Sequence, residues 1–464
     1  TATVGSATTV TSTDVNVDAG DDITLSGVDA AKVEMATVQV TTASGLTAEV
    51  GTETSVVSQA LKVDVVSDTK VSTADMALEA SGTMSVSGQE SLTVSAGTVA
   101  LDAAQDGTIR MGGDAVLAAG DGIRMASVTA LDVVTGGTAS VISNELDVSV
   151  DSAVRGSMDS LSVSVSDDAT VSVGDDLTVN AKDVRVRGEG DFDLRTSGAG
   201  TVSSNSVDMS VDAGLSVSAG GAVGITSASV DVSSSTSVAV STGSLSLDSA
   251  AATEVFSGTS LTATTTTLEA HSAEDTALTA GGRVTTTSAD ATVNVGDTID
   301  LSAVDMRVRN SGSVDVYAAE ATRLTSTDMT LSVSDEVQIL GGNEVVLTTD
   351  SLVLNADTAA DISTTDMAMS VDDALTATVG AATTVTSTDV KVDAGDGIEL
   401  SGVNAAEVEV DSVKVTTASG LTAEVGTETS IVSKDLNVDV LDGARVSTDD
   451  LAIEAAGTMS VSGE

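Results

Sequence analysis

The chain has 464 residues and a formal net charge of -52, with no Pro, no Cys, no Trp, one Tyr and two Phe. Phosphate binding needs clustered Lys and Arg, so this charge disfavours a nucleic-acid partner, and the chain has no run of about 18 apolar residues that would insert into a membrane. The lack of Cys excludes a disulfide framework, while a hydrophobic content of 41% separates the chain from typical disordered sequences.

The first elements that the sequence predicts are short β-strands in which apolar and polar residues alternate, as in 15–17, 23–25 and 33–35. Gly, Asp and Ser, which tolerate tight bends, separate these strands. Each strand start is followed by an apolar residue 23 positions later, and the starts define the first predicted core columns: Val15, Ile23, Val33, Val38, Leu46 and Val56. Three unequal spacings that sum to about 23 residues predict one turn of a solenoid with three strands and three corners.

The same spacing continues in the middle of the chain. Two further predicted core columns consist of Val184, Val207 and Val230, and of Phe192, Leu215 and Val238. The sequence therefore predicts an all-β fold, a single-chain three-sided parallel β-solenoid (a β-helix) with about 23 residues per coil and about 20 coils. This fold explains the missing Pro, because a Pro would remove a ladder hydrogen-bond donor wherever it fell in a strand.

The C-terminal part of the chain repeats the N-terminal part. Residues 1–89 align without gaps with residues 376–464, and 65 of the 89 positions are identical. Apolar positions stay apolar, as in Val56 and Ile431, whereas polar positions change charge, as in Lys32 and Glu407. We therefore expect residues 1–464 to form one continuous rod within a longer chain, and we expect it to associate end to end or laterally with copies or continuations of itself.

Two short basic runs stand out on this acidic background, "VRVR" at 184–187 and "MRVR" at 306–309. If the apolar residues of each run point inward, then Arg185, Arg187, Arg307 and Arg309 point outward. One interpretation is that these residues dock onto a neighbouring acidic rod. The alternative is that they pair with Asp or Glu in the adjacent coil of the same chain.

No catalytic, cofactor-binding or specific metal-binding residue is predicted, and we expect the protein not to be an enzyme. The single His, His271, is expected at the surface or a corner. Acidic corners such as "DAGDDI", "AGDGI" and "VGDDL" offer carboxylates for non-specific association with Ca²⁺, but the regular nonapeptide of calcium-binding solenoids is missing. A glycan-active β-helix would need carboxylates in an aromatic-lined groove, and three aromatic residues are too few for one.

The run "DDATVSVGDDLTVNAKDVRVRG" at 167–188 resembles the needle-like β-helices of phage tail spikes and type VI secretion spike proteins, which carry "GDLTV"-like octads. That resemblance implies an intertwined trimer in which each chain supplies one side. The chain also resembles, in a general way, giant bacterial and algal surface proteins with repetitive β-solenoid shafts. We expect a structural protein that forms a stiff, acidic filament or shaft, extracellular or at the cell surface. The alternative is the stalk of an adhesin or of a secretion or phage-type spike.

Overall fold

A computed structural model shows a chain of β-strands joined by short bends, without a helix among the described residues. The structure describes residues 2–463 apart from short gaps at 5–7, 20–22, 28–30, 43–45, 51–52, 66–68, 112–113, 128–129, 296, 380–381, 395–397, 403–404, 418–419, 426–427, 441–442, 448–449 and 456–458. It divides into two compact units, Thr1–Ser235 and Thr236–Glu464, which we call unit 1 and unit 2.

The strands of unit 1 are short, or join into longer strands of 12 or 13 residues. They are β1 (Ala2–Val4), β2 (Thr8–Ala19), β3 (Ile23–Gly27), β4 (Ala31–Thr42), β5 (Leu46–Val50), β6 (Glu53–Val65), β7 (Thr69–Ser72), β8 (Asp75–Ala80), β9 (Met84–Gly88), β10 (Leu92–Ala103), β11 (Gly107–Met111), β12 (Ala115–Ser127), β13 (Ala130–Thr135), β14 (Thr138–Ser143), β15 (Glu145–Val150), β16 (Ala153–Val165), β17 (Ala169–Val173), β18 (Leu177–Gly188), β19 (Phe192–Thr196), β20 (Gly200–Ser203), β21 (Ser206–Val211), β22 (Leu215–Ala219), β23 (Ala222–Ser227) and β24 (Ser229–Ser234).

Unit 2 has the same kinds of strand. They are β25 (Ser237–Ser249), β26 (Thr253–Ser257), β27 (Ser260–Ser272), β28 (Thr276–Ala280), β29 (Arg283–Ser288), β30 (Asp290–Val295), β31 (Thr298–Ser302), β32 (Asp305–Asn310), β33 (Val314–Ala318), β34 (Ala321–Val333), β35 (Glu336–Gly341), β36 (Glu344–Ala356), β37 (Ala359–Ser363), β38 (Asp366–Val371), β39 (Leu375–Val379), β40 (Ala382–Ala394), β41 (Ile398–Gly402), β42 (Ala405–Thr417), β43 (Gly420–Val425), β44 (Glu428–Val440), β45 (Gly443–Ser447), β46 (Asp450–Ala455) and β47 (Met459–Gly463).

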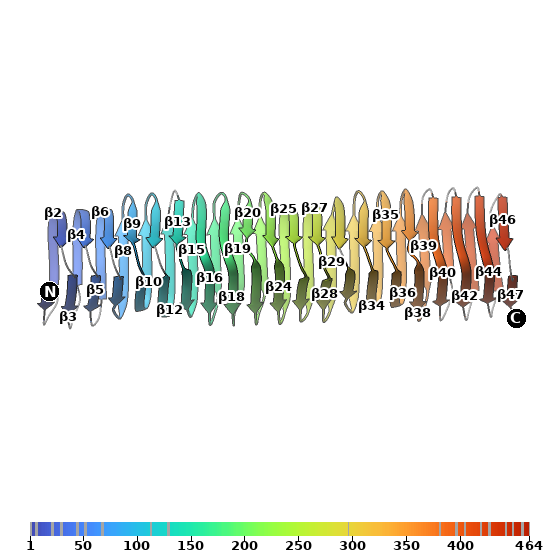
Figure 1. Cartoon of the computed structure of the whole chain (residues 1–464), viewed down its shortest axis with the longest axis horizontal. Helices are drawn as coiled ribbons and strands as arrows, with labels where there is room; N and C mark the ends of the chain where they lie inside the picture. The colour runs from blue at the N-terminus through green and yellow to red at the C-terminus, as the bar shows by residue number, and fades with distance from the viewer. Residues whose placement is uncertain are drawn as a thin grey trace. The chain divides into compact units, whose positions relative to one another are not determined.

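Strands pair in parallel with the strands one turn earlier and one turn later, so that successive turns lie side by side within each unit (Figure 1). In unit 1, Val184 of β18 lies opposite Val207 of β21, which lies opposite Val230 of β24. The spacing varies locally, because Thr54 pairs with Met76 after 22 residues. The described residues thus form an all-β parallel β-solenoid of about 15 turns with about 23 residues per turn, which confirms the predicted fold class and period.

Side chains alternate between the inside and the outside of each unit, as the pleat of a strand requires. In β15, Leu146, Val148 and Val150 are buried, whereas Asp147 and Ser149 are exposed. Burying a Val or Leu side chain contributes roughly 1.5–3 kcal/mol, so many modest and similar contributions hold each turn to its neighbours.

The predicted core columns are found mostly in this interior. Eight of their residues are at most 9% exposed: Val38, Leu46, Val184, Phe192, Val207, Leu215, Val230 and Val238. Val56 is partly exposed, and the side chains of Val15, Ile23 and Val33 lie outside the described residues.

Candidate functional site

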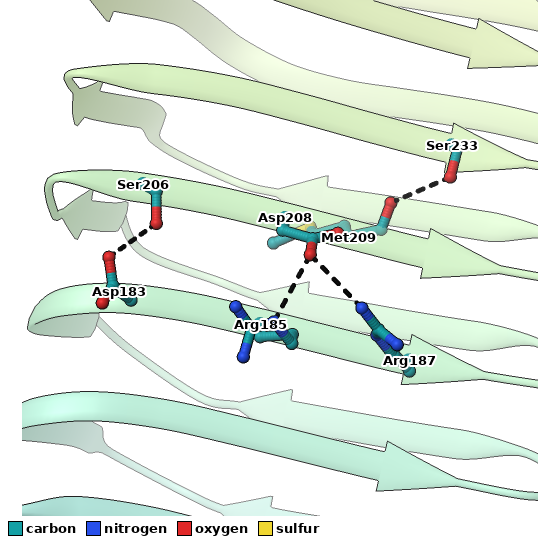
Figure 2. A network of polar contacts seen from close by, with 7 residues as sticks. All are labelled: Asp183, Arg185, Arg187, Ser206, Asp208, Met209 and Ser233. Carbon is teal, nitrogen blue, oxygen red and sulfur yellow. Dashed lines mark hydrogen bonds and ion pairs between the residues drawn. The ribbon is translucent and has the colours of Figure 1, made fainter.

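The first predicted arginine pair lies on the outer face of β18 in unit 1. Val184 and Val186 of this strand are 3% and 4% exposed, so Arg185 and Arg187 point outward. Both guanidinium groups approach one carboxylate in the next turn, that of Asp208 on β21 (Figure 2). The Nε atom of Arg185 lies 3.4 Å from Oδ2 of Asp208, and Nη2 of Arg187 lies 3.7 Å from the same oxygen.

Neighbouring polar groups extend this connection between turns. The hydroxyl of Ser206 donates a 2.7 Å hydrogen bond to the carboxylate of Asp183, which lies opposite it in the preceding turn. The hydroxyl of Ser233 lies 3.5 Å from the backbone carbonyl oxygen of Met209, one turn earlier (Figure 2). These contacts run along the stacking direction, so this face of unit 1 connects three successive turns.

The second predicted pair lies on β32 in unit 2, and its two members differ. The Nε atom of Arg307 lies 3.0 Å from Oδ1 of Asp305, and Oδ2 of the same carboxylate accepts a 2.9 Å bond from Arg283 in the preceding turn. Arg309 forms no ion pair with any residue that the structure describes. Its neighbours in the adjacent turns are Thr287 and Ser332, which carry no charge.

Other cations on the outer faces pair with acidic residues of an adjacent turn, as Arg185 and Arg187 do. Arg155 lies 3.7 Å from Asp132, the residue opposite it one turn earlier. Arg323 lies between turns, 3.8 Å from Asp300 and 3.3 Å from Glu344. These side chains are about half exposed, and ion pairs of that kind contribute about 0–1 kcal/mol each. Arg185 and Arg187 thus pair with a carboxylate of the adjacent turn, as the second interpretation expects, whereas Arg307 pairs with Asp305 of its own strand.

Aspartates at the bends also connect successive turns, through the backbone. Oδ1 of Asp168 accepts a 2.9 Å hydrogen bond from the backbone N–H of Asp191, and Oδ1 of Asp191 accepts a 2.7 Å bond from that of Gly214. In the "VGDDL" corner, Asp176 accepts a 2.8 Å bond from the N–H of Ala199. Carboxylates at these bends thus cap N–H groups that would otherwise lack a partner.

The acidic corners were considered above as places for Ca²⁺. The described residues contain no group of three or more His, Cys, Asp or Glu side chains arranged to hold a metal ion. Parts of "DAGDDI" and of the "AGDGI" copy at 394–398 lie outside the described residues, whereas "VGDDL" lies within them.

Three carboxyl groups have shifted pKa values. Burial, followed by the charge of Asp361 and a hydrogen bond to it, raises the pKa of Glu336 above its ordinary 4.5. Burial also acts to raise the pKa of Asp64, but hydrogen bonds from Lys62 and Ser87 outweigh it and lower that pKa below 3.8. Hydrogen bonding from Lys391 is the main cause that lowers the pKa of Asp393.

His271 lies on the exposed outer face of β27 in unit 2, as the sequence predicts. Its neighbours in the adjacent turns are Asp248 and Asn294.

Sequence reasoning missed a set of inward hydroxyl groups at the bends. The hydroxyl of Ser257, which is 0% exposed, lies 3.0 Å from the carbonyl oxygen of Thr236 and 2.7 Å from that of Ser260. The hydroxyl of Thr349 lies 2.9 Å from the carbonyl oxygens of both Thr327 and Ser351. A signal was present, because short strands such as "TEVFS" end in Ser or Thr where alternation requires an inward residue.

Within the described part of the chain, no helix is long and apolar enough to cross a membrane. Comparison with known proteins found no matching family model, no similar curated protein and no similar solved structure.

Proposed function

We propose that the chain is a structural protein, a stiff and acidic extracellular filament or shaft that belongs to a giant repeat protein. One observation carries the proposal: the outer polar side chains connect successive turns to each other, as Asp208 and Asp305 do with arginines and Asp191 does with the backbone. Substrate-binding side chains converge on a concave site, whereas these contacts are distributed along the outer faces. Repetition of one turn extends and stiffens such an assembly.

We also propose that the cross-section is three-sided. Support comes from unit 2, where three separate columns of residues run through the same turns. They are Leu261, Val284, Met306 and Met329; Leu268, Ala291, Val314 and Val337; and Thr276, Ile299, Thr322 and Val345. At about 23 residues per turn, the whole chain corresponds to about 20 turns.

The number of chains in the particle tests this proposal against a trimeric spike. In an intertwined trimer each chain supplies one side, so its strands pair with other chains. The pairing of Val207 with Val184 and Val230 of the same chain favours one chain per solenoid. Sedimentation equilibrium in dilute solution should therefore give 45.6 kDa. A mass three times larger, unchanged on further dilution, would replace the filament with the stalk of a trimeric spike.

We propose lateral self-association as the role of the remaining predicted arginine. Arg309 is exposed, and the residues opposite it are uncharged, so its guanidinium is available for an acidic face of a second copy. The substitution Arg309→Ala should weaken lateral association, measured by sedimentation velocity at about 0.15 M salt, where the repulsion between the acidic chains is screened. Arg185→Ala serves as the control, because Arg185 already pairs with Asp208. Equal effects of the two substitutions would refute this role for Arg309.

A further inference from the structure

The interior of the solenoid has positions that differ in how well they are filled. Each straight stretch of strand directs three alternate side chains inward. In β8 these are Met76, Leu78 and Ala80, and they are 7%, 8% and 4% exposed. The first and last of the three lie next to bends, whereas the middle one is farthest from the bends and faces the axis. The size of the middle side chains therefore determines how much space remains along the axis.

In the first part of unit 1 most of these middle positions are occupied by valine, although β8 has Leu78 and β5 has Ala48. Val63, Val71 and Val86 point inward, yet each keeps an intermediate exposed fraction. Further along the same columns, Ile109 lies opposite Val86, and Leu117 is two turns beyond Val71. Ile109 and Leu117 are only 8% and 6% exposed. The interior is thus incompletely filled around Val63, Val71 and Val86, whereas Val94, Ile109 and Leu117 further along the same columns are buried.

The space that remains is a cavity of about 250 Å³ within unit 1. Its lining extends from Val17 to Leu131 and consists mainly of Val, Leu, Met, Ala and Ile side chains. These residues span about five turns, and at about 4.8 Å per turn the cavity extends over roughly 24 Å. Apolar cavities of about 150 Å³ stay dry and bind benzene or xenon, so a cavity of this size and lining is suited to an apolar guest.

We propose that this cavity is a binding site for an unbranched alkyl chain. Its volume is distributed over about five turns, so it is long and narrow, and a ring or a branched hydrocarbon would need a width that the surrounding valines do not leave. The lining offers almost no polar surface, so a charged or hydrogen-bonding guest would lose its hydration without a replacement. The site is independent of the outer faces on which the proposed structural function rests.

The test uses the full chain, refolded in the presence of dodecane or of cyclododecane and then passed through gel filtration. The hydrocarbon retained per chain is measured by extraction and gas chromatography. The triple variant Val56→Leu, Val63→Leu, Val71→Leu fills the middle positions of one turn. The control Val57→Leu makes the same chemical change at the next residue along β6, whose side chain points to the opposite face.

We expect the wild type and Val57→Leu to retain dodecane, the triple variant to retain at least 10-fold less, and cyclododecane to be retained at least 10-fold less than dodecane. Equal retention of dodecane by the triple variant, or none by the wild type, would overturn the proposal. Equal retention of the ring and the chain would overturn the assignment to an unbranched guest. If the triple variant does not fold, as judged by circular dichroism, the single variant Val71→Leu should still show a several-fold loss relative to Val57→Leu.

Discussion

Two buried threonines in unit 2 should respond in opposite ways to the same substitution. Thr322 is 0% exposed and lies between Ile299 and Val345 in one column, and its hydroxyl has no hydrogen-bond partner among the residues that the structure describes. A buried polar group without a partner costs about 1–3 kcal/mol. Thr322→Val keeps the shape of the side chain and removes the hydroxyl, so it should stabilise the surrounding turns by about that amount.

The matched control is Thr349→Val, at a site that is 2% exposed. Its hydroxyl donates to the carbonyl oxygens of Thr327 and Ser351, so the same substitution removes hydrogen bonds and should cost about 0.5–1.5 kcal/mol. The two predictions differ in sign, although residue type, burial and fold are the same.

Local amide hydrogen exchange is the appropriate measurement, because a solenoid is quasi-one-dimensional and a long repeat array does not unfold in one two-state step. Exchange in β31, β34 and β36 should slow by about 5- to 140-fold in Thr322→Val, since about 1.4 kcal/mol corresponds to a factor of ten. Faster exchange in this variant would show that the hydroxyl of Thr322 has a partner, such as an ordered water, and would refute the reasoning.

Three further predictions concern a bend and the acidic surface. A Cβ atom at Gly174 would clash with the carbonyl oxygen of Asp151, so Gly174→Ala should speed amide hydrogen exchange in the flanking strands β17 and β18, whereas Gly224→Ala, whose added Cβ would meet no atom of the described residues within 4 Å, should leave exchange unchanged or slow it. Because the folded state raises the pKa of Glu336, its charged form is disfavoured, and Glu336→Gln should stabilise the surrounding turns at neutral pH but not at pH 3, as local amide exchange compared with the wild type at each pH will show. The lowered pKa of Asp64 acts in the opposite sense. The ionised Asp64 side chain contributes stability above its ordinary pKa of 3.8, and this stability is lost as the pH falls through the folded-state pKa. Asp64→Asn should therefore destabilise the protein at pH 7 and have little effect at pH 2.

The sequence predicts the interior better than the outer contacts, and the reason is geometric. Val184, Val207 and Val230 could be aligned because a constant spacing of 23 keeps them on one face. Near the second arginine pair one turn has only 22 residues, since Val284 pairs with Met306. A spacing of 23 would place Val284, an inward residue, opposite Arg307, and a shift of one residue exchanges the two faces of a strand. The residues that pair with outward side chains therefore depend on the local register, which cannot be derived from the composition or from the average period.

The buried hydroxyl groups could not be predicted for a different reason. Thr and Ser are assigned to the outside by alternation and polarity, and most of them do lie there. At a bend, however, the backbone turns away from the ladder and leaves carbonyl groups that need donors. A short hydroxyl side chain such as that of Ser257 reaches them from the inside, where a Val would leave them without a partner. The requirement comes from the tertiary path of the bend, so the sequence offers only the position of the residue at the strand end.

The charge of the chain separates the two modes of self-association that we propose. Lateral contact brings faces together on chains that each carry a net charge of -52, and pairs such as that of Arg155 with Asp132 neutralise only a few of the 70 acidic residues. This repulsion acts over a Debye length of about 30 Å at 0.01 M salt but only about 8 Å at 0.15 M. Addition of a turn end to end relies instead on backbone hydrogen bonds and apolar columns, which salt screens little. Lateral association should thus appear only as the ionic strength rises, whereas end-to-end association should persist at 0.01 M salt. If both modes respond equally to salt in light scattering and electron microscopy, then charge does not control how the copies meet.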